Sequence, residues 1–240
     1  MPIIEAKNLE KTYDGEAGTA STQALTGATL NIEEGEFVAI MGPSGSGKST
    51  LLHILGFLDK QSEGTYKFNG NAIEELDDAE LAKTRNSEMG FVFQAFNLLP
   101  KATVLENIKL PLMYSAISEH VWNALAEEAI EAVGLSHRTH HLAAQLSGGE
   151  KQRAAIARAL VMKPKVIFAD EPTGNLDSRS GQAVMKIIQD LNENHGHTIV
   201  LITHETYTAE HAQRIIRLKD GEIESDEKVG HRHKAYEYIK

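Results

Sequence analysis

The sequence has no cysteine and no long apolar run, and each absence excludes a class of protein. Without cysteine, neither a disulfide framework nor a thiolate metal site can form. No stretch approaches the roughly 20 apolar residues that a membrane-spanning helix needs. Glu5, Lys7 and Glu10 interrupt any apolar run that a signal peptide would need at the N-terminus. We therefore expect a soluble intracellular chain, which a partner must hold at any membrane where it works.

An excess of positive charge is also absent. The 240 residues include 34 acidic and 24 basic side chains, which give a formal net charge of −10. Proteins that bind nucleic acid need a basic face for the phosphate backbone, and docking on anionic lipid by charge needs clustered Lys and Arg. The acidic balance argues against both, so no nucleic-acid partner is expected. The length fits one large domain or two tightly joined ones.

Short apolar runs alternate with longer helical patterns, which indicates a mostly parallel sheet with crossover helices. The predicted strands are Phe37–Met41, Gly90–Phe93, Val166–Ala169 and Thr198–Ile202. The predicted helices cover residues 48–58, 120–133, 150–162 and 180–194. Small polar residues predict a flexible loop over 14–22, and the mainly helical residues 95–162 predict a subdomain. The charged and aromatic residues 225–240 carry no assignable pattern.

The clearest motif lies between a predicted strand and a predicted helix and fits the phosphate-binding pattern G-x-x-x-x-G-K-[ST]. Its residues are Gly42, Pro43, Ser44, Gly45, Ser46, Gly47, Lys48 and Ser49, followed by Thr50 in the helix. The glycines let the backbone N–H groups wrap a polyphosphate, and the helix N-terminus adds positive potential. Lys48 can reach the β- and γ-phosphates, and the Ser49 hydroxyl can bind Mg²⁺. The motif predicts nucleotide binding.

Two carboxylates follow a predicted buried strand far downstream. Asp170 and Glu171 come directly after Val166–Ala169, and charges at the tip of an apolar strand are costly unless a charged partner waits there. Bound Mg²⁺ would be that partner: Asp170 would hold the metal through a water molecule. Glu171 would polarise the water that attacks the γ-phosphate. The alternative is an ordinary acidic strand end at the surface.

A second candidate anion site opens the helix predicted over 150–162. Ser147, Gly148, Gly149 and Glu150 precede that helix, where free N–H groups and the helix dipole favour an anion. The alternative is a plain helix cap, a role that suits Ser147. The cluster of His137, His140 and His141 suggests metal binding, but without cysteines or a nearby carboxylate pattern a solvated helix end is the better interpretation.

The order and spacing of these motifs resemble the ABC transporter ATPases, whose signature is Leu-Ser-Gly-Gly-Gln. Here Leu146 to Glu150 read Leu-Ser-Gly-Gly-Glu. The resemblance covers residues 3–224 and implies further roles. It makes Tyr13 the residue that stacks on adenine and Gln94 the sensor of Mg²⁺ and the attacking water. It also places Asp177 in the loop that crosses the dimer seam and makes His204 a contact to the γ-phosphate.

Three longer segments resemble the lipoprotein-release and macrolide-export (LolD/MacB-like) subfamily. They are residues 42–52, 91–100 and 170–177. The implied fold is α/β: a P-loop NTPase (RecA-like) core with a mainly parallel sheet, an N-terminal antiparallel β part and an inserted α-helical subdomain. Residues 1–224 would form the ABC ATPase domain, with the helical subdomain at about 95–162, and residues 225–240 would follow as a tail.

The resemblance also implies a mechanism and partners. Two copies would bind MgATP head to tail, with Lys48, Gln94, Glu171 and His204 as catalytic residues and Ser49, Gln94 and Asp170 around the metal. A separate membrane permease would dock in a groove near residues 95–113, on the cytoplasmic face of the membrane, for export or for extraction of lipoprotein or envelope substrates. The alternatives are a mechanotransmission or cell-division ATPase that moves no substrate, and a soluble ABC ATPase acting on nucleic acid.

Overall fold

The computed structural model describes residues 1–15 and 21–234. Most of the loop predicted over 14–22, and the last six residues of the 225–240 stretch, lie outside the described residues. The chain divides into two units. The first contains residues 1–82 and 200–232, and the second contains residues 83–199 together with residues 233 and 234.

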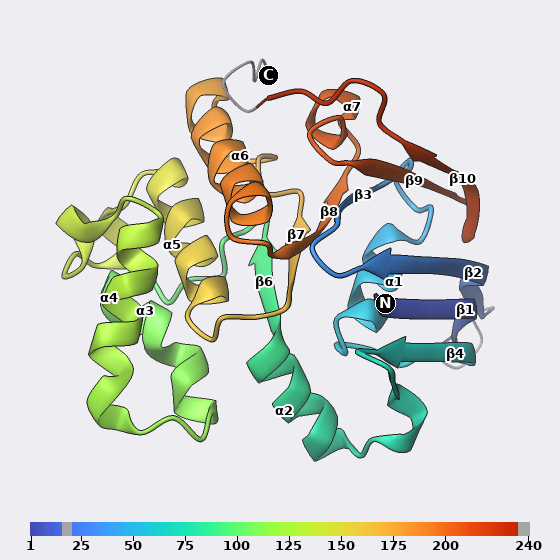
Figure 1. The fold of residues 1–240 in the computed structure, drawn as a ribbon, viewed down its shortest axis with the longest axis horizontal. Helices are drawn as coiled ribbons and strands as arrows, with labels where there is room; N and C mark the ends of the chain where they lie inside the picture. Colours follow the sequence, from blue (N-terminus) through green and yellow to red (C-terminus); the bar gives the residue numbers. More distant parts are fainter. Residues whose placement is uncertain (16–20, 235–240) are drawn as a thin grey trace. The chain divides into compact units, whose positions relative to one another are not determined.

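The first unit contains an antiparallel sheet at the N-terminal end (Figure 1). Strand β1 (Pro2–Tyr13) lies between β2 (Thr22–Glu33) and β4 (Glu63–Phe68), and β4 also pairs with β5 (Asn71–Ala72). Ile4 and Leu9 are buried, whereas Lys7 is exposed. Such mixed burial is typical of antiparallel strands with one face toward the core. The sheet confirms the antiparallel β part implied by the family resemblance.

The first unit also holds buried strands that the phosphate motif follows. All five residues of β3 (Phe37–Met41) are buried, and β3 pairs in parallel with β9 (Arg214–Lys219). Strand β8 (Thr198–Thr203) is the other neighbour of β3, and β10 (Glu222–Lys228) pairs antiparallel with β9. Helix α1 (Lys48–Leu55) is fixed to β4 because the buried Tyr66 hydroxyl donates to the Leu55 carbonyl over 2.7 Å. The short helix α7 (Thr206–Ala209) follows β8.

The second unit is mainly helical around one parallel strand pair, β6 (Met89–Phe93) and β7 (Val166–Asp170). Its helices are α3 (Val104–Lys109), α4 (Trp122–Ala132), α5 (Gly148–Leu160) and α6 (Ser178–Glu193), and α2 (Asp78–Glu88) begins in the first unit. Short 3-10 helices are η1 (Ile73–Glu75), η2 (Leu110–Tyr114), η3 (Glu119–Val121), η4 (Ser136–Arg138) and η5 (Ala143–Gln145). None of the helices in the described ranges is long and apolar enough to cross a membrane.

The four predicted strands are confirmed as β3, β6, β7 and β8, and the four predicted helices as α1, α4, α5 and α6. Their ends differ by a few residues: α1 stops at Leu55, where Gly56 forms the C-cap, and α5 begins at Gly148 because Ser147 caps it. Strand β10 continues to Lys228, so the first residues of the 225–240 stretch belong to the sheet.

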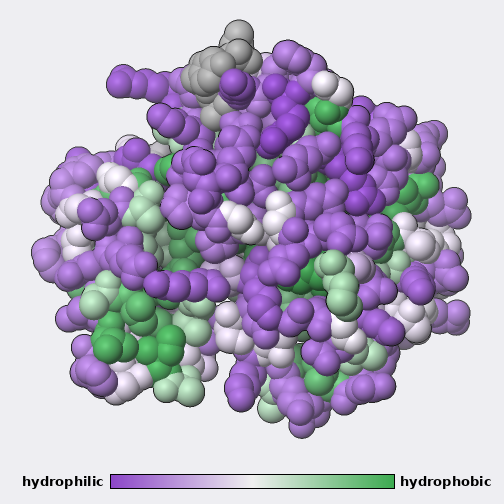
Figure 2. Space-filling model, viewed as in Figure 1, coloured by the Kyte–Doolittle hydropathy of each residue, from purple (hydrophilic) through white to green (hydrophobic). Residues whose placement is uncertain are grey.

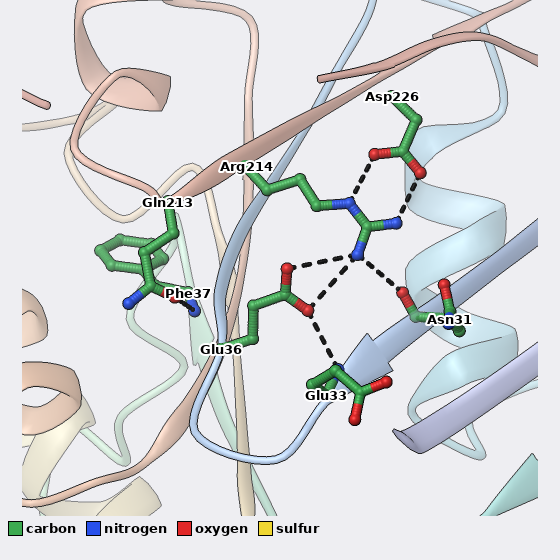
Figure 3. Close-up of polar contacts among 7 residues, drawn as sticks. All are labelled: Asn31, Glu33, Glu36, Phe37, Gln213, Arg214 and Asp226. Carbon is green, nitrogen blue, oxygen red and sulfur yellow. Dashed lines mark hydrogen bonds and ion pairs between the residues drawn. The ribbon is translucent and has the colours of Figure 1, made fainter. Parts of the chain in front are cut away.

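Arg214 connects three segments at the edge of the first unit (Figure 3). Its guanidinium donates to both carboxylate oxygens of Asp226 on β10, to Glu36 in the turn before β3, and to the Asn31 carbonyl on β2 over 3.1 Å. The side chains of Arg214 and Glu36 are each only 16% exposed. These contacts hold the pKa of Arg214 above its ordinary value. A planar guanidinium suits such a site because it presents several fixed donors at once.

Replacing Arg214 with Met is expected to lower the free energy of unfolding by about 2 kcal/mol, because two carboxylates lose their charged partner in a half-buried setting. Chemical denaturation measures the loss. Lys219→Met on the same strand is the control, since its pair with Glu224 is 3.4 Å long and more than half exposed and should contribute at most about 0.5 kcal/mol. Equal losses in the two variants would contradict a structural role for the Arg214 cluster.

Candidate nucleotide site

The loop between β3 and α1 has the backbone conformation of a phosphate cradle. Gly45 and Gly47 have φ angles of 80° and 96°, in the left-handed region that favours glycine. A Cβ atom on Gly42 or Gly47 would lie closer than 3.0 Å to backbone carbonyl oxygens, those of Leu218 and Ala24 respectively. Glycine is therefore required in this loop for two reasons: some positions have left-handed dihedral angles, and some lie too close to neighbouring strands for a side chain.

The side chains of the same loop fit a polyphosphate. Lys48 is 8% exposed, and its ammonium donates to the Pro43 carbonyl over 2.7 Å, which holds it across the loop. The Ser46 hydroxyl is buried and has no hydrogen-bond partner among the described residues, a state that is costly unless a ligand supplies the partner. Ser44, Gly45 and Ser49 are exposed. An anion bound here would meet one ammonium, one unpaired hydroxyl and the N-terminus of α1.

Tyr13 lies at the end of β1 and is 40% exposed. Its hydroxyl donates to Asp59 over 2.8 Å, and the Lys11 ammonium lies 4.9 Å from the ring centre. Lys11 in turn bonds Asp59 over 2.6 Å, so the ring is fixed by an ion pair. Burial raises the pKa of Tyr13. A fixed and partly exposed aromatic ring is a suitable surface for stacking a base.

His204 follows the last residue of β8, the strand next to β3 in the sheet, and its side chain is exposed. In open α/β sheets ligands bind beyond the carboxyl ends of the strands. Within the first unit, Lys48 and His204 thus follow the carboxyl ends of two neighbouring strands.

In the second unit, Asp170 ends β7 and Glu171 follows in the left-handed region, with φ of 44°. This conformation costs a residue other than glycine roughly 1–3 kcal/mol and often occurs at functional sites. The backbone of this carboxylate is therefore set by the surrounding structure, not by its own preference. Carboxylate oxygens are among the ligands that Mg²⁺ prefers, so Asp170 is by its chemistry a suitable ligand for that ion.

Gln94 follows β6 and contacts the loop that contains Asp177. Its side-chain amide donates to the Asn175 side chain over 3.5 Å, and the Asn175 amide donates back to the Gln94 carbonyl over 3.0 Å. A Cβ on Gly174 would lie 2.6 Å from the Gln94 amide nitrogen, so a larger residue here would displace the Gln94 side chain from its present position. Asp177 caps α6 by accepting from the Ser180 N–H over 2.9 Å.

The Ser147 segment forms a capping box at the start of α5. The Ser147 hydroxyl accepts from the Glu150 N–H over 3.3 Å, and the Ser147 N–H donates to the Glu150 carboxylate over 2.9 Å. Hydrogen bonds from Ser147 are the main cause that lowers the pKa of Glu150 to about 2. A Cβ on Gly149 would lie 2.8 Å from the Ser180 hydroxyl, which places this segment directly against the first turn of α6.

Known proteins resemble this chain along most of its length. The family model for the ABC transporter matches residues 25–174. The chain is 48% identical to the uncharacterized ABC transporter ATP-binding protein MJ0796 of Methanocaldococcus jannaschii, over 95% of this chain and 97% of that protein. It is also 48% identical to the macrolide export ATP-binding/permease protein MacB of Bdellovibrio bacteriovorus, over 95% of this chain and 34% of that protein. The chain belongs to the ABC transporter family.

Solved structures agree with that assignment. A dimeric, post-hydrolysis structure of the cassette MJ0796 bound to ADP and Pi matches this fold with a TM-score of 0.85 at 47% identity, over 94% of this chain and 98% of that one. The cbiO1 structure from Clostridium perfringens matches with a TM-score of 0.83 at 30% identity, over 95% and 89% of the two chains. The expected α/β fold is thus confirmed, and the chain is an ABC ATPase that uses ATP and Mg²⁺. It spans about a third of the length of the MacB relatives.

The structure divides the predicted site residues of this cassette between its two units. Tyr13, the residues 42–50 and His204 belong to the first unit. Gln94, Asp170, Glu171, residues 147–150 and Asp177 belong to the second. No group of three or more His, Asp or Glu side chains in the described part of the chain is arranged to hold a metal ion. His137 and His141 instead lie beside Glu150 and Arg138.

Sequence reasoning missed Arg158 on α5. Phe96 and Asn97, just after Gln94, have φ angles of 62° and 51°, and the Arg158 guanidinium donates to the carbonyl oxygens of both. Arg158 therefore fixes a left-handed turn next to Gln94 that these residues do not favour by themselves. Arg158 lies 61 positions from Asn97 and 62 from Phe96, and contacts over such separations leave no local sequence pattern. The sequence signal for this role is an arginine among the alanines of α5.

Proposed function

We propose that this cassette is the ATP-hydrolysing subunit that drives a separate integral membrane permease in export or in extraction of lipoprotein or envelope substrates. Two copies close head to tail on ATP, with the Ser147 segment of each copy facing the nucleotide in the phosphate loop of the other. The observation that supports this is that two helices of one chain, α1 and α5, begin at glycine-containing motifs, of which only α1 begins with a lysine; we take both helix starts as anion sites. Head-to-tail pairing by a two-fold axis completes two identical sites.

In the proposed reaction each group of residues has a separate role. Tyr13 stacks on adenine, and residues 42–50 hold the phosphates. Glu171 accepts a proton from the attacking water, and His204 and Lys48 stabilise charge on the γ-phosphate oxygens. Ser49, Asp170 and Gln94 would hold Mg²⁺, which would supply positive charge against the phosphate oxygens. Residues 147–150 and Asp177 serve the site of the opposite copy. Residues 1–224 act as the ATPase domain, with the helical subdomain at about 95–162.

The permease is proposed to dock near residues 95–113 of the second unit, holding the cassette at the cytoplasmic face of the membrane. Leu99, Met113 and Tyr114 are 51%, 59% and 79% exposed, and large apolar side chains at such exposure need explanation when they gather in one region. Figure 2 shows hydrophobic residues gathered over the part of the molecule that carries α3 and α4. The contact between Gln94 and Asn175 would connect this surface to the nucleotide. The macrolide-export relatives, whose names include a permease, support such a partner.

The docking proposal is tested by cell fractionation. Wild-type protein expressed at native levels is expected to sediment with membranes. The double change Met113→Glu and Tyr114→Glu should shift the distribution toward the soluble fraction by about tenfold or more, because two apolar contacts are lost. Leu58→Glu, at another exposed apolar residue (44%), is the control and should stay with the membranes. A wild-type protein that never sediments with membranes would contradict the proposal.

A further inference from the structure

The fifth signature residue of this cassette is a carboxylate where the family pattern has a neutral amide. The Glu150 side chain is 14% exposed, and one of its oxygens, Oε2, accepts from both the Ser147 N–H and the Ser147 hydroxyl, each over 2.9 Å. The low pKa of Glu150, about 2, means that its charge is present at any working pH. A full negative charge thus lies at the helix start that is proposed to receive a phosphate, and like charges repel.

Arg138 is the cation that lies against this charge. Its Nε–H donates to the other Glu150 oxygen, Oε1, over 2.8 Å. Arg138 ends the 3-10 turn η4, where its backbone N–H bonds the Leu135 carbonyl over 2.8 Å, and its Nη1–H lies 3.1 Å from Nε2 of His141. The turn therefore fixes the backbone of Arg138, and His141 contacts its guanidinium. A second ionisable group near Glu150 is His137, whose ring nitrogen is 3.9 Å away on a side chain 61% exposed.

The two carboxylate oxygens have separate partners, which explains how the pair can serve the site. Arg138 engages Oε1, and Ser147 engages Oε2. The capping box that shapes the start of α5 is therefore complete without Arg138, because its bonds use Oε2 and the Ser147 hydroxyl. What Arg138 adds is charge. A glutamine at residue 150 could form the same box with no charge to neutralise, and Arg138 would then have little electrostatic role.

We propose that Arg138 is a positioning residue that neutralises Glu150, so that the Ser147 segment of one copy can face the nucleotide held by the phosphate loop of the other. The inference rests on the proposed head-to-tail dimer. Loss of Arg138 leaves Glu150 uncompensated at the closing interface. ATP binding to a single copy does not change, since the phosphate loop belongs to the other unit of the chain, whereas ATP-dependent pairing and hydrolysis become weaker.

A double-mutant cycle tests the electrostatic role. Arg138→Met is made in the wild-type protein and in Glu150→Gln, and kcat/KM for ATP is measured for all four proteins. In the wild-type background the change should lower kcat/KM by about tenfold or more, as expected for a charge left unpaired at an interface. In the Glu150→Gln background it should change kcat/KM by less than about twofold, because no charge remains to neutralise. Lys163→Met, which removes a cation from its 2.9 Å pair with Glu128, is the matched control and should match the wild type.

Two further measurements separate this role from a structural one. The affinity of a single copy for a fluorescent ATP analogue should be the same in wild type and Arg138→Met. The defect of Arg138→Met should shrink when salt is raised from about 0.05 M to about 0.5 M, because screening weakens the repulsion. An equal loss in both backgrounds, or no loss in either, would overturn the inference. A wild-type protein that hydrolyses ATP without ever pairing would instead overturn the head-to-tail proposal on which it rests.

Discussion

Replacing Glu171 with Gln is expected to give a protein that binds ATP and pairs stably, but hydrolyses ATP about 10²–10⁴-fold more slowly, the range for loss of a general base. The amide has nearly the shape of the carboxylate and cannot take a proton from water. Glu171 follows the last residue of β7 with a left-handed backbone, so the loop fixes its position whichever side chain is present. The variant also removes a negative charge that we propose to lie beside the γ-phosphate, which should favour the ATP-bound dimer.

Single-turnover phosphate release measures the chemical step, and size-exclusion chromatography with and without ATP measures pairing. The control is Glu131→Gln on α4, an exposed carboxylate in the same unit, which should match the wild type in both assays. Wild-type turnover by Glu171→Gln would show that another group takes the proton. Slow hydrolysis without a stable ATP-bound dimer would separate the catalytic role from the proposed pairing.

The strands that follow from the sequence are the ones buried on both faces. All residues of β3 and β8 are buried. The sequence of β3 is apolar throughout and that of β8 is apolar between its two terminal threonines, so both stand out from their surroundings. Strands β1, β2, β9 and β10 were not predicted individually, because exposed polar residues interrupt their apolar positions. Helix α2 was missed for a similar reason, since Leu81 is its only buried residue.

Those residues of the candidate site that belong to short sequence motifs could be predicted. Lys48, Asp170 and Ser147 each stand at the junction of a strand or loop with a helix, or at a strand end, and such junctions have recognisable sequences. The residues that support them could not be predicted. Asn175 contacts Gln94 from 81 positions away, and Arg158 reaches the Gln94 loop from 61. Such contacts depend on how the helices pack, and the spacing of residues in one sequence does not predict that packing.

Gly47→Ala is expected to weaken ATP binding by roughly a hundredfold, because about 3 kcal/mol of strain must be relieved by moving the phosphate loop. The φ of 96° at Gly47 disfavours any side chain. The added Cβ would also meet the Ala24 carbonyl and, at 3.0 Å, a methyl group of Leu25. Both belong to β2, which pairs with β1 and cannot retreat without breaking that ladder. Isothermal titration with ATP measures the change.

The weaker ATP binding of Gly47→Ala should come from the steric clash with β2 and not from the φ angle alone. The variant Gly134→Ala distinguishes the two causes. Gly134 has a φ of 68° with no atom within 4 Å of an added Cβ, so its alanine variant carries only the backbone cost of about 1–2 kcal/mol. That variant should be less stable and bind ATP as tightly as the wild type. Normal ATP binding by Gly47→Ala would contradict this prediction. It would mean that contact with β2 does not determine the conformation of the phosphate loop, and that the bound ligand does.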